Sequence, residues 1–107
     1  MVSRPSIHTI RKDNMNDNLY FKHHLGNVLR NLRHEQSLKL TTLSALSRIS
    51  VAHISDIERG KKSASFDVIE ALARGLDTPL STILHSVAEQ VESEEQMYSR
   101  HKQLTAV

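Results

Sequence analysis

Residues 40–62, LTTLSALSRISVAHISDIERGKK, decide the fold of this chain. The first segment repeats an apolar residue at three-residue steps, at Leu40, Leu43 and Leu46. Such spacing is typical of a helix that buries one face. A new apolar pattern begins only a few residues later, so the stretch predicts two short helices that are joined by a tight turn and followed by a basic segment.

The second helix of this stretch is expected to begin after Ser50, whose side-chain oxygen can accept a hydrogen bond from an amide of the first turn. Ile54 and Ile57 lie three residues apart and should face the core. Two helices with this tight turn form the layout of a helix-turn-helix, which places its second helix in the major groove of DNA. The residues left pointing outward are Val51, Ala52, His53 and Asp56.

The outward face of the second helix carries short side chains at its beginning, where a surface helix normally carries long charged ones. Ser50 and His53 can exchange hydrogen bonds with base edges. Val51 and Ala52 can contact a thymine methyl group, and Asp56 can accept a hydrogen bond from a cytosine amino group. An apolar pair of this kind also fits packing against a neighbouring segment, so the choice depends on the surrounding charge.

Positive charge is concentrated in the half of the chain that contains this stretch. Residues 19–62 hold eight Lys or Arg against three acidic residues, a balance of +5, whereas residues 63–107 have a balance of −4. Neutralising phosphates releases counterions and supplies much of the affinity of a DNA-binding protein. Candidate phosphate contacts are Lys39, Arg48, Arg59, Lys61 and Lys62 around the motif, with Lys22, Arg30 and Arg33 in the preceding helix.

Three more helices are predicted around the motif, and no segment has the alternation of a strand, so the chain is expected to be all-α with five helices. One helix should cover residues 19–36. Another should begin at the capping residue Ser65 and end at Gly75, and a last one should start at Pro79. The expected organisation is a flexible arm over residues 1–18, a DNA-binding domain over 19–85, and an extended C-terminal helix with a tail over 86–107.

The last predicted helix is longer than the domain requires, because its apolar stripe continues as far as Val91. Helix-turn-helix proteins commonly bind as twofold dimers to half-sites about 34 Å apart. We therefore expect a homodimer that uses the later part of this stripe. Folding of the helix back onto its own core is the alternative. The predicted dimer contacts are Leu84, Val87, Ala88 and Val91.

The run DIERGKK at residues 56–62 resembles the helix-turn-helix of the phage repressor and Cro class, also called the xenobiotic response element family. The resemblance covers about residues 25–84 and implies a repressor-like fold that binds double-stranded DNA. It also implies that Glu58 is buried and pairs with an arginine of the first helix, here Arg33. Gly60 would end the recognition helix in the left-handed conformation.

Two residues depart from the pattern of that family. Arg48 stands in the turn where the family usually has glycine, so the turn has either a different backbone geometry or strain. Lys39 stands where a Thr or Ser usually caps the first motif helix.

The longer run LSRISVAHISDIERGKKSAS, residues 46–65, is similar to the Clp gene regulators of actinobacteria, including the arginine in the turn. This resemblance implies a bacterial, nucleoid-associated activator of genes for Clp proteases, itself removed by Clp proteolysis. The apolar end of the chain, residues 103–107, would then be the segment that Clp protease recognises. A tail without any role is an equal alternative.

Composition argues against an enzyme, a metal protein and a membrane protein. The chain has no cysteine, and its seven histidines include no HExxH spacing, so we expect no metal and no other cofactor. It also lacks a glycine-rich phosphate loop and a GxSxG turn, so no catalytic residue is predicted. No run of about 18 apolar residues and no secretory leader is present, which indicates a cytoplasmic protein. An antitoxin with the same fold is the alternative function.

Overall fold

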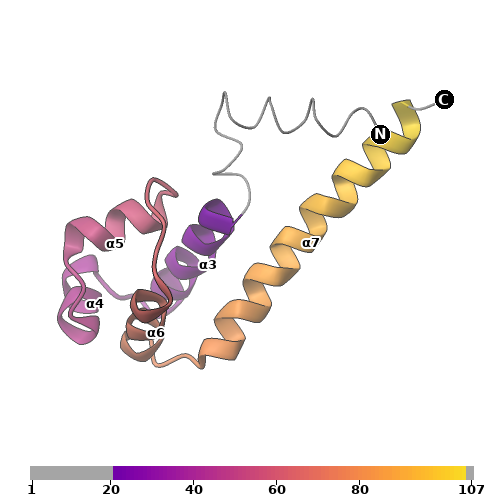
Figure 1. Ribbon diagram of the computed structural model, residues 1–107. Helices are drawn as coiled ribbons and strands as arrows, with labels where there is room; N and C mark the ends of the chain where they lie inside the picture. Colours follow the sequence, from indigo (N-terminus) through magenta and orange to yellow (C-terminus); the bar gives the residue numbers. More distant parts are fainter. Residues whose placement is uncertain (1–20, 106–107) are drawn as a thin grey trace.

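The computed structural model describes residues 21–105, with side chains over residues 21–100, and within this part of the chain it consists of five α-helices without strands (Figure 1). The predicted all-α fold is confirmed. The predictions for residues 1–18 and for the side chains of residues 103–107 lie outside the described residues. The helices are α3 (Phe21–Glu35), α4 (Leu40–Ser47), α5 (Val51–Glu58), α6 (Phe66–Gly75) and α7 (Leu80–Thr105).

Two of the predicted helix caps are present. The Oγ atom of Ser50 accepts a hydrogen bond from the backbone amide of His53 at 3.1 Å, and that of Ser65 accepts one from Val68 at 3.2 Å. Each bond satisfies an amide that the first helical turn leaves without a partner. The N-cap of α4 is Lys39, which makes no side-chain capping bond, as its chemistry predicts.

Helix α6 ends at Gly75, as predicted, but the glycine is needed for packing rather than for a left-handed backbone. A Cβ atom on Gly75 would lie 2.9 Å from Cδ1 of Leu43 and 3.1 Å from Cβ of Ser47, both on α4. The left-handed residue after α6 is Asp77, with φ of 50°. The next helix begins at Leu80, directly after Pro79.

The core is aliphatic and lies where α3, α4, α5, α6 and the first half of α7 meet. Ile54 and Ile57 are buried as predicted. Fully burying an aliphatic side chain of this size contributes about 1.5–3 kcal/mol, so these residues dominate the favourable term in folding. The largest fully buried side chains are Leu25, Leu29, Leu43, Ile54, Ile57, Ile69, Leu72, Leu76 and Ile83.

The prediction that Leu46 faces the core with Leu43 is wrong. Leu43 is fully buried, whereas Leu46 is 57% exposed. Three residues of an α-helix fall about 60° short of a full turn, so a three-residue step carries the third leucine away from the core. The residue four positions after Leu43 is Ser47, and this small polar side chain is buried instead.

The long helix α7 packs along α3 (Figure 1). Val87 on α7 is only 3% exposed and belongs to the core, and His24 on α3 is also buried. His24 Nδ1 lies 3.0 Å from Oε1 of Gln90, and its Nε2 lies 2.5 Å from Oε1 of Glu94. The predicted boundary at residue 85 therefore falls inside α7, and the helix stays attached to the domain beyond it.

Candidate nucleic-acid interface

The turn between α4 and α5 is built around a left-handed arginine. Arg48 has φ of 65° and ψ of 24°, and its amide donates to the carbonyl oxygen of Ser44 at 2.8 Å. The turn thus keeps the geometry that glycine would give, with the steric cost of a side chain in the left-handed region. The sequence left open whether this turn has a different backbone geometry or a strained one, and the structure shows the strained geometry.

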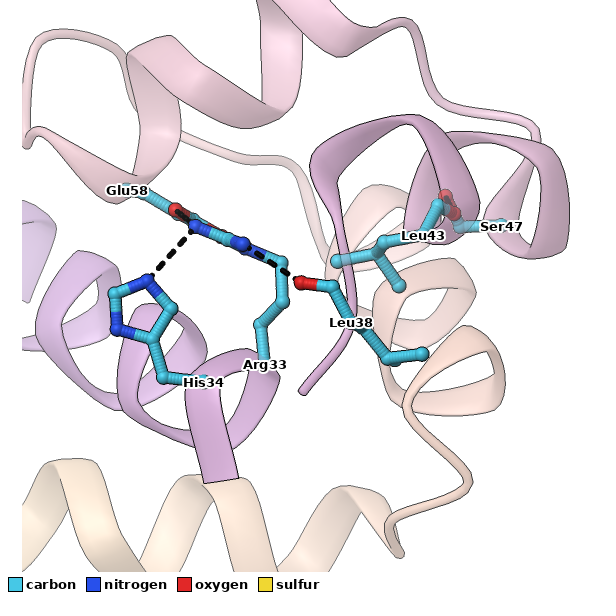
Figure 2. Close-up of polar contacts among 6 residues, drawn as sticks. All are labelled: Arg33, His34, Leu38, Leu43, Ser47 and Glu58. Atoms are coloured by element: carbon cyan, nitrogen blue, oxygen red, sulfur yellow. Dashed lines mark hydrogen bonds and ion pairs between the residues drawn. The ribbon is translucent and has the colours of Figure 1, made fainter. Parts of the chain in front are cut away.

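Ser47 stabilises this turn from inside, which the sequence analysis missed. Its Oγ donates to the carbonyl oxygen of Leu43 at 2.7 Å and accepts from the amide of Ile49 at 3.2 Å. A buried hydroxyl can do both because it has one donor and two acceptor positions. The sequence feature that could have predicted this role is a serine four residues after the buried Leu43, at the start of the turn (Figure 2).

Helix α5, the second helix of the motif, is held at its C-terminal end by the predicted pair of Arg33 and Glu58. Nε of Arg33 donates to Glu58 Oε2 at 2.8 Å, and Nη2 donates to Oε1 at 2.9 Å. Nη1 donates to the carbonyl oxygen of Leu38, in the segment that leads into α4, at 2.8 Å. Figure 2 shows the guanidinium lying between Glu58 and Leu38, so one side chain joins α3, α5 and the start of the motif.

The hydrogen bonds between the two side chains outweigh the effect of burial on the charge of Arg33. The Glu58 side chain is 4% exposed and that of Arg33 is 11% exposed. The hydrogen bonds to Glu58, assisted by its charge, raise the pKa of the Arg33 guanidinium, and burial opposes them. Because Arg33 is buried and committed to Glu58, it is not available for phosphate, and its prediction as a phosphate contact is wrong.

Helices α3 and α5 touch through their backbones at Gly26. A Cβ atom at this position would lie 2.4 Å from the carbonyl oxygen of Ile57 and 2.7 Å from that of Glu58. Only glycine permits this approach, because both neighbours are backbone atoms that cannot rotate away. Gly26 and Arg33 thus fix α5 from the inside and leave its opposite face outward.

The outward face of α5 carries the side chains that were predicted to read bases. Ser50, Val51 and Ala52 are exposed, and His53 is partly exposed. The Ser50 hydroxyl already accepts a hydrogen bond as the cap, but it keeps its donor and one more acceptor position for another partner. The beginning of α5 is therefore a short-chained surface that a duplex can approach closely.

Asp56, the fifth predicted base contact, lies among cations. Its Oδ1 accepts from Nη2 of Arg59 at 3.1 Å, and its Oδ2 lies 3.8 Å from Nζ of Lys62. The segment after α5 turns at Gly60, whose φ of 73° is the left-handed conformation that the sequence predicted. The structure thus brings together Asp56 and the basic residues that follow α5.

The five phosphate contacts that were predicted around the motif are all exposed and lie on three segments of it. They precede α4, occupy the turn, and follow α5. Arg30 on α3 is also exposed, whereas Lys22 is partly buried. Exposed cations both before and after a short outward helix in the sequence suit contacts with DNA phosphates. The exposed cations of the motif are Lys39, Arg48, Arg59, Lys61 and Lys62.

The four predicted dimer contacts divide into two kinds. Val87 packs against α3 within the chain, so it is not free to contact a partner in this arrangement. Leu84 and Ala88 are exposed and Val91 is partly buried. They line a shallow, mostly apolar groove of about 380 Å³ together with Phe21 at the start of α3.

Neither a metal site nor a membrane span is found in the part of the chain that the structure describes. Within it, no three His, Asp or Glu side chains are grouped so that they could hold a metal ion. None of its helices is long and apolar enough to cross a bilayer.

A clamped turn, a short outward helix and flanking cations define a helix-turn-helix domain, and residues 24–85 match the family described as helix-turn-helix domain. The chain belongs to this family.

Among its relatives is the transcriptional regulator ClgR of Mycobacterium tuberculosis, which is 34% identical over 73 residues. This match covers 68% of the chain but only 65% of the length of that relative.

Solved structures of regulators share the fold. The Clp gene regulator ClgR from C. glutamicum superposes with a TM-score of 0.61 at 28% identity, over 64% of this chain and 90% of that one. The restriction-modification controller protein C.AhdI from Aeromonas hydrophila gives a TM-score of 0.55 at 32% identity, over 56% of this chain and 91% of that one. The similarity to a Clp gene regulator agrees with the resemblance carried by residues 46–65.

Proposed function

We propose that this protein is a sequence-specific DNA-binding transcriptional regulator that inserts α5 into the major groove. The observation that carries the proposal is the outward, short-chained face of α5, with exposed cations in the segments that precede and follow it. The relatives that match are transcriptional regulators, which favours this function over an antitoxin. The site of action would be the bacterial cytoplasm, at the nucleoid.

Two groups of residues divide the work of binding. Ser50, Val51, Ala52 and His53 contact base edges, because they lie at the exposed beginning of α5. The five exposed cations of the motif contact phosphates, which fixes the register of α5 in the groove without reading sequence. Asp56 is not included among the base contacts, because both of its carboxylate oxygens already have a cation nearby.

The two groups are distinguished by their salt dependence. Lys61→Ala should weaken binding to every duplex alike and lower the salt slope by about one unit. Ala52→Leu, which adds no charge, should cost roughly 1–3 kcal/mol on duplexes selected by the wild-type protein and much less on mixed-sequence DNA. Fluorescence anisotropy at several salt concentrations measures both. An unchanged salt slope in Lys61→Ala would show that Lys61 does not contact phosphate.

The regulator acts as a homodimer through the groove on α7. Leu84, Ala88 and Val91 present an apolar surface beside Phe21, and a twofold pair would carry two α5 helices to successive major grooves. Leu84→Asp should produce monomers in analytical ultracentrifugation. Met97→Asp, an exposed apolar position farther along α7, is the matched control. A wild-type monomer, or a Leu84→Asp dimer of wild-type affinity, would remove this groove from the interface.

Activation of Clp protease genes is the most specific part of the proposal. The similarity to a Clp gene regulator supports clp genes as targets, and activation rests on the resemblance of residues 46–65. Transcript levels of Clp protease genes should fall when the gene for this protein is deleted, and chromatin immunoprecipitation should place the protein at their promoters. Unchanged transcripts and an absence of the protein from these promoters would contradict this target.

Removal by Clp protease rests on the resemblance alone, and the tail it would use lies outside the described residues. Replacing Ala106 and Val107 by Asp should lengthen the lifetime of the protein in cells. An unaltered lifetime would mean that Clp protease does not recognise the tail as a degradation signal.

A further inference from the structure

The carboxylate of Asp56 lies on α5, but its contacts are with the basic segment that follows this helix. Oδ1 accepts a hydrogen bond from Arg59 Nη2 at 3.1 Å, and Oδ2 lies 3.8 Å from Lys62 Nζ. The backbone carbonyl of the same residue accepts from the amide of Lys61 at 2.8 Å and from that of Lys62 at 3.4 Å. Residue 56 therefore holds this segment through both its side chain and its backbone.

These contacts do not suit a residue that reads a base. To accept a hydrogen bond from a cytosine, Asp56 would have to leave Arg59 or share its oxygen with it. The carboxylate would also enter the groove between two phosphate backbones without its cations, where its own charge is repelled. The paired arrangement avoids both costs.

The main effect of the Asp56 carboxylate is to lower the net positive charge of the segment that would contact DNA. Arg59 and Lys62 are more than half exposed, and exposed ion pairs contribute little to folding. A negative charge a few ångströms from two cations, however, reduces the attraction that they exert on phosphate. This effect does not depend on the base sequence.

We propose that Asp56 is a positioning residue that keeps Arg59 and Lys62 beside α5 and, as their counter-charge, limits the affinity of the protein for DNA of any sequence. The inference rests on the proposed function, because it assumes that this segment meets phosphate. By weakening the sequence-independent part of binding, Asp56 lets the base contacts of α5 account for more of the preference between sites.

The test compares Asp56→Asn with a matched charge control. Asparagine removes the charge but keeps an oxygen that can accept from Arg59. Glu35→Gln makes the same change in net charge at an exposed position that lines the groove between α3 and α7, away from the motif. The probes are a duplex selected by the wild-type protein from a random pool and a mixed-sequence duplex of equal length, titrated at several salt concentrations.

Asp56→Asn is expected to bind both duplexes more tightly by the same factor, roughly three- to tenfold near 0.1 M salt, with a steeper salt slope. Glu35→Gln should leave both affinities close to those of the wild type. In an Arg59→Gln background the gain from Asp56→Asn should shrink, because one of the two cations that it releases is gone. A residue with a merely structural role would not change the salt slope.

A different pattern would overturn the inference. If Asp56→Asn weakens binding to the selected duplex alone and changes the preference at one base pair, Asp56 reads a base, and the proposed function stands without this inference. If the variant and the wild type have equal affinities and slopes, Asp56 does not limit binding. If the wild-type protein selects no duplex from the pool and does not bind the mixed-sequence duplex, the proposed function fails and the inference fails with it.

Discussion

Replacing Glu58 with glutamine should destabilise the fold by about 3 kcal/mol, because the change leaves the guanidinium of Arg33 buried without its counter-charge. Removing one partner of a buried pair costs about 3–5 kcal/mol. The lower end applies here, since the Arg33 side chain is 11% exposed and retains its bond to the Leu38 carbonyl. The loss should lower the melting temperature by about 10–25 °C in a domain of this size.

Circular dichroism at the helical band, followed during urea and thermal unfolding, measures this loss. The double variant Arg33→Met/Glu58→Leu should be less destabilised than Glu58→Gln, because it removes both buried charges and fills the space with apolar atoms. The pKa of Arg33 is raised in the folded state. The charged guanidinium therefore stabilises the fold fully at any pH below its unfolded pKa, and this stabilisation is lost only as the pH rises through the folded pKa. The contribution of Arg33 should therefore be constant across neutral pH. A loss below about 1 kcal/mol in Glu58→Gln, or losses that simply add in the double variant, would refute the reasoning.

Three further predictions test the fold around the recognition helix. Leu43→Ala should cost about 2–5 kcal/mol whereas Leu46→Ala should cost less than about 0.5 kcal/mol, and similar losses in urea unfolding would contradict the observed burial. Gly26→Ala should cost about 1–3 kcal/mol, since the new methyl group meets two backbone carbonyls of α5; a stabilised variant would show that the helices can separate freely. Arg48→Gly should stabilise the chain by up to about 1 kcal/mol by relieving a left-handed arginine, while lowering the salt slope of DNA binding by about one unit. A less stable Arg48→Gly variant would mean that the side chain stabilises the turn.

Much of the motif was predictable because local chemistry decides it. The caps at Ser50 and Ser65 need only an oxygen at the right distance from the next amides, and both are present. The left-handed Gly60 follows from its position after α5. The pairing of Arg33 with Glu58 came from the family resemblance and was confirmed by two short hydrogen bonds.

What the sequence could not predict depends on the angle between elements. Leu40, Leu43 and Leu46 look equivalent in the sequence, but Leu43 is fully buried, Leu40 is partly buried against the core, and the rotation of the helix exposes Leu46. Val87 was assigned to a dimer contact because nothing local reveals that α7 packs on α3. Nothing local predicts that His24 is buried, because its hydrogen-bonding partners Gln90 and Glu94 lie more than sixty residues away in the sequence. Asp56 looked like a free acceptor until its distances to Arg59 and Lys62 were known.

The central claim is that the face of α5 and the basic segment after it form the DNA-binding surface. Amide chemical-shift changes in a labelled sample, recorded while a duplex selected from a random pool is added, test this claim most directly. The largest changes should lie within residues 48–62, at the turn, along α5 and at the cations that follow it, with a smaller set near Lys39. Changes concentrated on α7, or a protein that selects no duplex from the pool, would contradict the account.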